Sequence, residues 1–136
     1  MSTSSIRVNT LFEWCNDISA TRAFYTDLLG LTETNYRDDE KIGWLSYQLG
    51  DVQLVFTRSS GLPVLDDWAK TLFFSDGTIE APMLLLRIAK EDFAPLVARL
   101  QASDVPIYEG DVDTSRVIFV RDPMGKTIEI DIDVEE

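Results

Sequence analysis

Residues 16–31 read NDISATRAFYTDLLGL, and this stretch predicts where a strand ends and a helix begins. Its first polar residues are good N-caps, because their side chains can accept hydrogen bonds from the first unpaired helical amides. Ala20, Phe24 and Leu28 then follow at four-residue spacing and form an apolar stripe along one side of a helix. Gly30 stands where a left-handed C-cap residue is needed. The stretch therefore predicts an amphipathic helix of about three turns.

The segments around this helix have the composition and the turns of β-strands. Residues 6–15 precede it and are rich in β-forming residues. The segments 32–37, 42–49 and 52–57 follow it and are separated by short charged or glycine-containing turns. The sequence up to Arg58 therefore predicts a strand, a helix and three strands, the later ones antiparallel.

The second half of the chain repeats this order. An Asp-Pro-Met-Gly turn at 122–125 joins its last two strands. A repeat of this length indicates duplication, and the alignment of the two halves places Thr10 opposite Met83. The expected elements are strands at 83–88, 105–108, 116–121 and 127–134, with a helix at 91–102.

Neither half could bury both a helix face and a sheet face alone, so the two are expected to pack together. We therefore expect an α+β fold in which two βαβββ modules form one domain over residues 1–136, with curved mixed sheets around a central hollow. The first module spans about residues 6–58 and the second about 82–134, with a connector at 59–81. The hollow is the expected ligand site.

Composition narrows the possible functions. The chain has 136 residues, and 24 acidic against 12 basic residues give a net charge of −12. This charge opposes binding to polyanions, so we expect no nucleic-acid partner. The sequence has neither an apolar run long enough to span a membrane nor a signal-like N-terminus, so we expect a cytoplasmic protein without a membrane partner.

The residue types also limit the chemistry. The chain has no histidine and one cysteine, Cys15. It therefore lacks the commonest metal ligand, the commonest general base and any intrachain disulfide. A carboxylate with a raised pKa is the main remaining base. Cys15 is expected to be a small buried hydrophobe, because no basic neighbour in the sequence would lower its thiol pKa.

The order of elements and three strings resemble the vicinal oxygen chelate superfamily, which includes glyoxalase I, extradiol dioxygenases, fosfomycin-resistance enzymes and bleomycin-resistance proteins. The strings are 16–31, LGDVQLVF at 49–56 and VRDPMGKTIEI at 120–130. The third is the most specific. Superfamily members commonly carry an Asp-Pro-x-Gly turn with a Glu four residues after the Gly, and Glu129 holds that place here.

The resemblance also implies where a metal would bind. Metal-dependent members place ligands, often two His and two Glu, on the first and fourth strand of each module. The corresponding positions here hold Thr10 and Met83 in place of His, and Gln53, or Leu54 if the register slips by one, in place of the first Glu. Only Glu129 is a good ligand for a hard cation. We therefore expect no metal and no cofactor.

Period-two alternation sorts the strand side chains into two faces. If Thr10 faces the hollow, Phe12 and Trp14 do so too. On the second module, Leu85 and Arg87 share a face with Met83. Thr127, Asp131 and Asp133 share one with Glu129. Arg87 could neutralise that carboxylate or could face the ligand itself. The alternatives are that the aromatic rings fill core space and that the acids form a solvated surface. The predicted ligand-binding residues are Thr10, Phe12, Trp14, Trp44, Gln53, Met83, Leu85, Arg87 and Glu129.

Three functions fit these observations. The first is a metal-free binding protein of the bleomycin-resistance kind, with a small planar or cationic molecule in an aromatic and acidic hollow. The second is a lyase, isomerase or dioxygenase-type enzyme in which Glu129 is catalytic, either within an atypical metal set or as general base. The third is an interaction module without a ligand. The resemblance implies a homodimer, and connector residues Trp68, Phe73 and Phe74 would add aromatic surface for it to cover.

Overall fold

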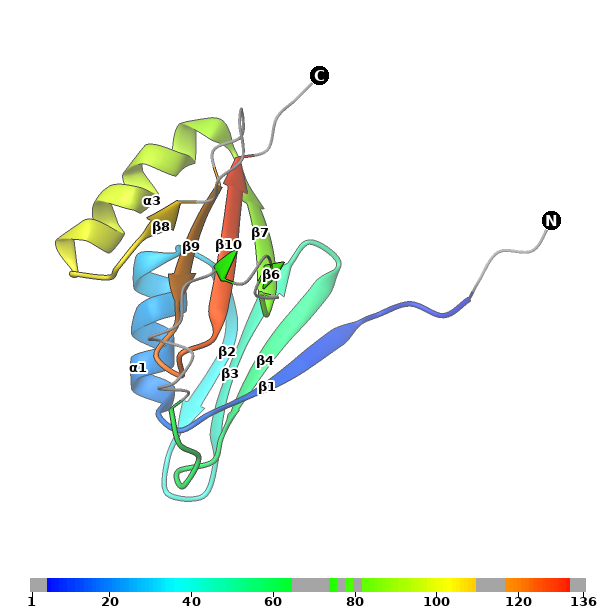
Figure 1. The fold of residues 1–136 in the computed structure, drawn as a ribbon. Helices are drawn as coiled ribbons and strands as arrows, with labels where there is room; N and C mark the ends of the chain where they lie inside the picture. The colour runs from blue at the N-terminus through cyan, green and yellow to red at the C-terminus, as the bar shows by residue number, and fades with distance from the viewer. Residues whose placement is uncertain (1–4, 65–73, 76–77, 80–81, 110–116, 133–136) are drawn as a thin grey trace. The chain divides into compact units, whose positions relative to one another are not determined.

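The computed structural model describes residues 5–64, 74–75, 78–79, 82–109 and 117–132. The chain divides into two compact units, Met1–Leu62 and Pro63–Glu136. Each unit contains one four-stranded mixed sheet (Figure 1). The predicted α+β fold with two βαβββ modules is therefore confirmed, while the packing of both modules around a hollow stays a prediction. Trp68, Phe73 and the side chain of Phe74 lie outside the described residues.

Unit 1 holds the first module. Its strand order is β1-β4-β3-β2, in which β1 runs parallel to β4 and the other neighbours are antiparallel. The first strand starts at Thr10 and not at Ile6 as the sequence predicted, and residues 6–9 are exposed. The elements are β1 (Thr10–Cys15), α1 (Ile18–Arg22), η1 (Ala23–Leu28), β2 (Thr32–Asp38), β3 (Gly43–Leu49) and β4 (Val52–Arg58).

The predicted helix exists, but its second half is not an α-helix. The Asp17 side chain caps α1 by accepting a hydrogen bond from the Ala20 amide at 3.0 Å. From Ala23 onward the chain forms the π-helix η1, which has i to i+5 hydrogen bonds. Phe24 and Tyr25 are both buried although they are adjacent in sequence. Gly30 has a φ of 78° and provides the predicted left-handed exit.

The helix packs on one face of its own sheet. The Tyr25 ring lies 4.7 Å from the Phe56 ring and 6.1 Å from the Tyr47 ring, centroid to centroid. At the edge of this core the Thr26 hydroxyl bonds the Tyr47 hydroxyl at 2.7 Å and donates to Glu33 at 3.0 Å. Burial raises the pKa of Tyr47 to about 12. These contacts leave the opposite face of the sheet uncovered by α1 and η1.

Unit 2 repeats the topology. Its sheet order is β7-β10-β9-β8, with β7 parallel to β10, which matches unit 1 strand for strand and agrees with duplication. The short strand that follows the helix of this unit is Tyr108–Glu109 and not 105–108, because Pro106 cannot donate to a ladder. The elements are β5 (Phe74–Ser75), β6 (Thr78–Ile79), β7 (Leu84–Ile88), α3 (Lys90–Ala102), β8 (Tyr108–Glu109), β9 (Val117–Arg121) and β10 (Thr127–Ile132).

The turn between β9 and β10 explains the most specific string of the sequence. The Asp122 side chain accepts hydrogen bonds from the Met124 and Lys126 amides, each at 2.9 Å. Gly125 has a φ of 85°, a conformation that favours glycine. The turn sets the register of β10 and so the face on which Glu129 lies.

Candidate functional site

Five predicted residues of the first module share one face of the unit 1 sheet. Thr10 lies opposite Gln53 in the parallel pair of β1 and β4. Trp14 and Trp44 both lie opposite Thr57, from the two neighbouring strands. We call this side of the sheet, which faces away from α1 and η1, the aromatic face. Its predicted residues are Thr10, Phe12, Trp14, Trp44 and Gln53. The register places Gln53, and not Leu54, on this face.

Two of the three aromatic rings on this face are exposed, and the third, Trp44, is half-buried. Phe12 and Trp14 are 62% and 56% exposed, so neither fills the core of unit 1. The Phe12 and Trp44 rings meet edge to face, with centroids 6.2 Å apart and planes at 71°. Aromatic pairs favour this geometry, which leaves a ring face free to stack on another flat group. Exposed aromatic residues grouped in this way make this face a candidate binding surface.

The polar residues between the rings are neutral. On β1, β3 and β4, each position on this face holds an aromatic, aliphatic, hydroxyl or amide side chain. Sequence reasoning missed Ser46, Gln48 and Thr57, although period-two counting from Trp44 and Gln53 would have found them. The Ser46 hydroxyl bonds the Thr34 hydroxyl at 2.8 Å. Ser46 is buried, so the accessible part of the aromatic face offers stacking surface and the neutral polar groups of Gln48, Gln53 and Thr57.

The charged candidates lie together on unit 2. Leu85 of β7 lies opposite Glu129 of β10, and Arg87 lies opposite Asp131. We call these four residues the acidic face. Met83 precedes β7, and its amide donates to the Thr127 carbonyl at 2.8 Å. Thr10 pairs with Gln53 in unit 1, and Leu85 pairs with Glu129 in unit 2. By strand pairing, Leu85 is therefore the counterpart of Thr10, whereas the sequence alignment gave Met83, two residues earlier.

The environment of Glu129 favours its protonated form. Burial is the main cause that raises the pKa of Glu129, and a hydrogen bond and repulsion from Asp131 raise it further, while Arg87 opposes the shift. Two carboxyl groups can share a hydrogen bond only if one of them carries a proton. The Oδ1 atom of Asp131 is buried and has no hydrogen-bond partner in the described part of the chain. Ionisation of Glu129 is therefore less favourable than that of an exposed glutamate.

Comparison of the sequence with models of protein families identifies the family of this chain. The model of the Glyoxalase/Bleomycin resistance protein/Dioxygenase superfamily matches residues 7–130. The chain belongs to this superfamily. No curated protein matches significantly. None of the helices in the described residues could span a membrane.

Solved structures of this superfamily share the fold. A glyoxalase/dioxygenase from Nostoc punctiforme is 22% identical, with a TM-score of 0.70 over 98% of this chain and 100% of that one. The antibiotic binding protein TnmS3 from Streptomyces sp. CB03234 is 20% identical, with a TM-score of 0.63 over 98% and 100%. Lactoylglutathione lyase from Agrobacterium tumefaciens is 15% identical, with a TM-score of 0.61 over 96% of each chain. Proteins of this fold thus bear the names of enzymes and of a binding protein.

The donors present here do not fit the metal that many superfamily members bind. At the strand positions implied for ligands, unit 1 offers the Thr10 hydroxyl and the Gln53 amide. Unit 2 offers Glu129 opposite an alkyl group, that of Leu85. No group of three or more Cys, Asp or Glu side chains within residues 5–64, 74–75, 78–79, 82–109 and 117–132 could hold a metal ion. Two neutral oxygen donors in unit 1, or one carboxylate at these positions in unit 2, are each a weak set for a divalent cation.

Proposed function

We propose that this superfamily member is a metal-free binding protein for a small planar or cationic molecule. The observation that carries the proposal is the aromatic face, where Phe12 and Trp14 are more than half exposed and Trp44 stands edge-on to Phe12. A flat conjugated ligand gains stacking energy from such rings without a metal. The likeness to TnmS3, named as an antibiotic binding protein, supports a binding role on this fold.

Glu129 is the residue proposed to recognise positive charge. Burial and Asp131 oppose ionisation of Glu129. A ligand cation nearby would favour the ionised carboxylate and form an ion pair with it. Leu85, which is 48% exposed, supplies apolar surface beside it, and Arg87 limits the total negative charge. We include Met83 in the proposed set as a polarisable side chain that precedes β7.

The test is a fluorescence titration with planar cations such as acridine dyes and with neutral flat analogues. We expect quenching of tryptophan emission, and a loss of about two- to twelvefold in affinity in Phe12→Ala, since an aromatic stacking contact contributes roughly 0.5–1.5 kcal/mol. Leu11→Ala is the matched control, because Leu11 is also exposed but lies on the other face of β1. Equal affinity in Phe12→Ala and the parent would contradict the assignment of the site.

Metal content tests the other half of the proposal. The purified protein should contain zinc, nickel, manganese and iron well below one equivalent per chain. A stoichiometric amount of any of them, retained through dialysis, would overturn the metal-free function.

A second candidate is an enzyme of the lyase, isomerase or dioxygenase type with Glu129 as its catalytic residue. Burial of Glu129 beside Asp131 favours it, because burial raises the pKa of that carboxyl and general acid–base catalysis uses carboxyls whose pKa is raised. Turnover of any substrate should then disappear in Glu129→Gln while substrate binding remains. Turnover that survives this substitution would exclude the role.

The proposal includes a homodimer. An edge strand with exposed apolar side chains is a surface that proteins cover or pair. In unit 1 the edge strand β1 and the residues before it expose five large apolar side chains: Ile6, Val8, Leu11, Phe12 and Trp14. A second copy of the chain would bury Ile6, Val8 and Leu11, which are not among the proposed ligand-binding residues.

A further inference from the structure

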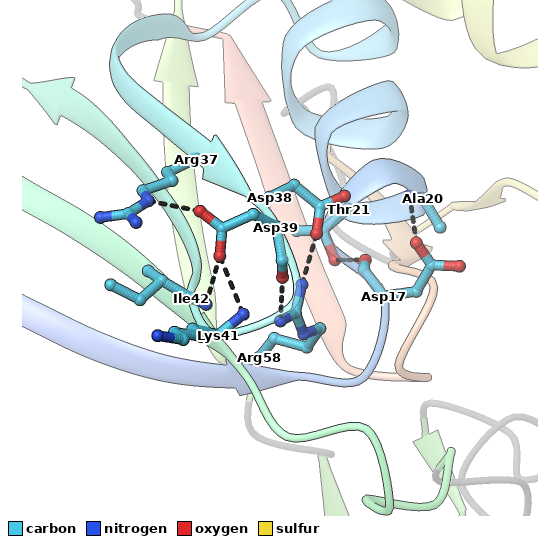
Figure 2. Close-up of polar contacts among 9 residues, drawn as sticks. All are labelled: Asp17, Ala20, Thr21, Arg37, Asp38, Asp39, Lys41, Ile42 and Arg58. Atoms are coloured by element: carbon cyan, nitrogen blue, oxygen red, sulfur yellow. Dashed lines mark hydrogen bonds and ion pairs between the residues drawn. The ribbon is translucent and has the colours of Figure 1, made fainter.

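Arg58 crosses the sheet of unit 1 on its helix side. It is the last residue of β4, yet its guanidinium donates to the Asp38 carboxylate and, at 2.7 Å, to the Asp39 carbonyl at the end of β2 (Figure 2). In the sheet, β3 lies between these two strands. The Arg58 side chain therefore ties together two strands that are not neighbours.

Gly43 makes this crossing possible. A Cβ atom at Gly43 would lie 2.5 Å from Cβ and 3.0 Å from Cζ of Arg58, and 2.9 Å from Cγ1 of Ile18. The first residue of β3 is thus bare backbone directly under the arginine. Any side chain there would push Arg58 away from Asp38.

Asp39 holds the turn that follows. Its carboxylate accepts hydrogen bonds from the Lys41 and Ile42 amides at 2.9 and 2.8 Å and from the Arg37 side chain at 2.6 Å (Figure 2). The Asp39 amide in turn donates to the Ile42 carbonyl at 2.9 Å. Asp39 fixes the turn from inside, and Arg58 fixes it to β4.

The residues tied in this way are adjacent to the row of aromatic residues. Trp44 follows Gly43, lies opposite Arg37 on β2 and opposite Thr57 on β4. Thr57 immediately precedes Arg58 and lies opposite Trp14. The contact of Arg58 with Asp38 therefore fixes the backbone on both sides of the position from which the Trp44 ring extends.

We propose that Arg58 is a positioning residue for the aromatic face: the contacts of Arg58 with Asp38 and Asp39 hold the Trp44 ring edge-on to Phe12. The consequence for ligand affinity rests on the proposed function, whereas the consequence for Trp44 does not. Arg58 itself touches no ligand, because it lies on the opposite side of the sheet.

The test uses the full chain with Trp14→Phe and Trp68→Phe, so that Trp44 is its remaining tryptophan. Arg58→Gln should move the Trp44 emission to longer wavelength and raise its acrylamide quenching about twofold, since a loosened segment admits the quencher. Asp38→Asn, a milder change at a more exposed residue, should act in the same direction. The double variant should go no further than the larger single effect, because both remove one contact. Far-UV circular dichroism confirms folding.

Arg22→Gln is the matched control. Arg22 also forms an ion pair in unit 1, with Glu33 at 2.8 Å, and its guanidinium lies 3.8 Å from the centroid of the Tyr36 ring, so its contacts are with β2 residues other than Asp38. It should leave the Trp44 emission as in the parent. Parent-like emission in both Arg58→Gln and Asp38→Asn, or an equal shift in Arg22→Gln, would overturn the proposal.

A second arm separates this proposal from the proposed function. With all tryptophans present, an acridine dye should bind Arg58→Gln several-fold more weakly than the parent, and Arg22→Gln as tightly as the parent. If Trp44 emission shifts while dye affinity is unchanged, the positioning role stands and the aromatic face is not the dye site.

Discussion

Neighbouring groups decide whether a carboxyl of this protein is stabilised as an ion, and two glutamates show opposite outcomes. The hydrogen bond from Arg22 is the main cause that holds the pKa of Glu33 below its ordinary value, and Thr26 adds to it. Burial, followed by Asp131, raises the pKa of Glu129. Ionisation of Glu33 therefore stabilises the fold, whereas ionisation of Glu129 opposes it.

The first prediction concerns the pH dependence of Glu129→Gln. The pKa of Glu129 is raised in the folded state. The contribution of this carboxyl to the free energy of unfolding is therefore fully present below the ordinary pKa of 4.5, and it is lost as the pH rises through the raised pKa. The variant should match the parent at pH 4 and be more stable at pH 7 in urea unfolding. Glu33→Gln is the control with the opposite sign, less stable than the parent at pH 7 and approaching it on acidification. Lower stability of Glu129→Gln at pH 7 would contradict the assigned environment.

The second prediction concerns Gly43. Gly43→Ala should lower the free energy of unfolding by about 1–3 kcal/mol, because its methyl group would overlap Arg58 and Ile18. Gly61→Ala is the matched control, since a Cβ there meets nothing within 4 Å, and it should be neutral or stabilising by up to about 1 kcal/mol. Chemical denaturation of both variants measures the difference. Similar values for the two would show that the crossing of Arg58 over Gly43 is dispensable.

Much of the residue-level pattern could be predicted from sequence where it depends on alternation. The shared face of Thr10 and Trp14 follows from period two, and Cys15 is buried as expected. The contact of Arg58 with Asp38 could not be predicted, because it joins residues twenty positions apart across an intervening strand. Such a contact follows from strand order, which composition and spacing do not encode.

At the scale of elements, the helices and turns were predicted better than the type of helix. The sequence predicts one amphipathic helix of about three turns within residues 16–31, whereas in the structure Ala23–Leu28 is π-helical. An apolar stripe with four-residue spacing is compatible with an α-helix and with a π-helix, since the two differ in which carbonyl each amide bonds. The cost of the wider turn is offset by burial of Phe24 and Tyr25 together.

The third prediction separates packing from binding on unit 2. Leu100 of α3 is fully buried, so Leu100→Ala should cost about 2–5 kcal/mol of unfolding free energy. Leu85→Ala removes the same atoms from a side chain that is 48% exposed and should cost well under that amount while weakening dye binding. Thermal melts and titrations of both variants measure this. If Leu85→Ala destabilised as much as Leu100→Ala, the acidic face would be core and not a binding surface.

At the scale of the whole molecule, the two units share one strand order although their faces differ in chemistry. The aromatic face is neutral on β1, β3 and β4, and the acidic face carries Arg87, Glu129 and Asp131. Duplication explains the common topology. The family and the α+β fold were predictable from local strings, because the turn at 122–125 and the helix entry at 16–18 are set by local hydrogen bonds.

The fourth prediction is the oligomeric state. Light scattering after size exclusion should give about twice the chain mass of 15.4 kDa. Val8→Glu should shift the protein to the monomer, because it places a charge among the exposed apolar residues before β1. Ile42→Glu, at an exposed apolar residue in the turn before β3, is the control and should leave the dimer intact. A parent protein that stays at 15.4 kDa at high concentration would exclude the dimer.

The strand order β1-β4-β3-β2 also has a kinetic consequence. Strands β2, β3 and β4 are joined by short turns and can pair as soon as each turn closes. Strand β1 pairs only with β4, which is the last strand of the unit 1 sheet in sequence. Closing that long loop costs more chain entropy than the turns do, so β1 should dock late on folding and detach early on opening. The fifth prediction is that native-state hydrogen exchange gives β1 amides a lower opening free energy than those of β3. Equal values would mean that the sheet opens as one cooperative unit.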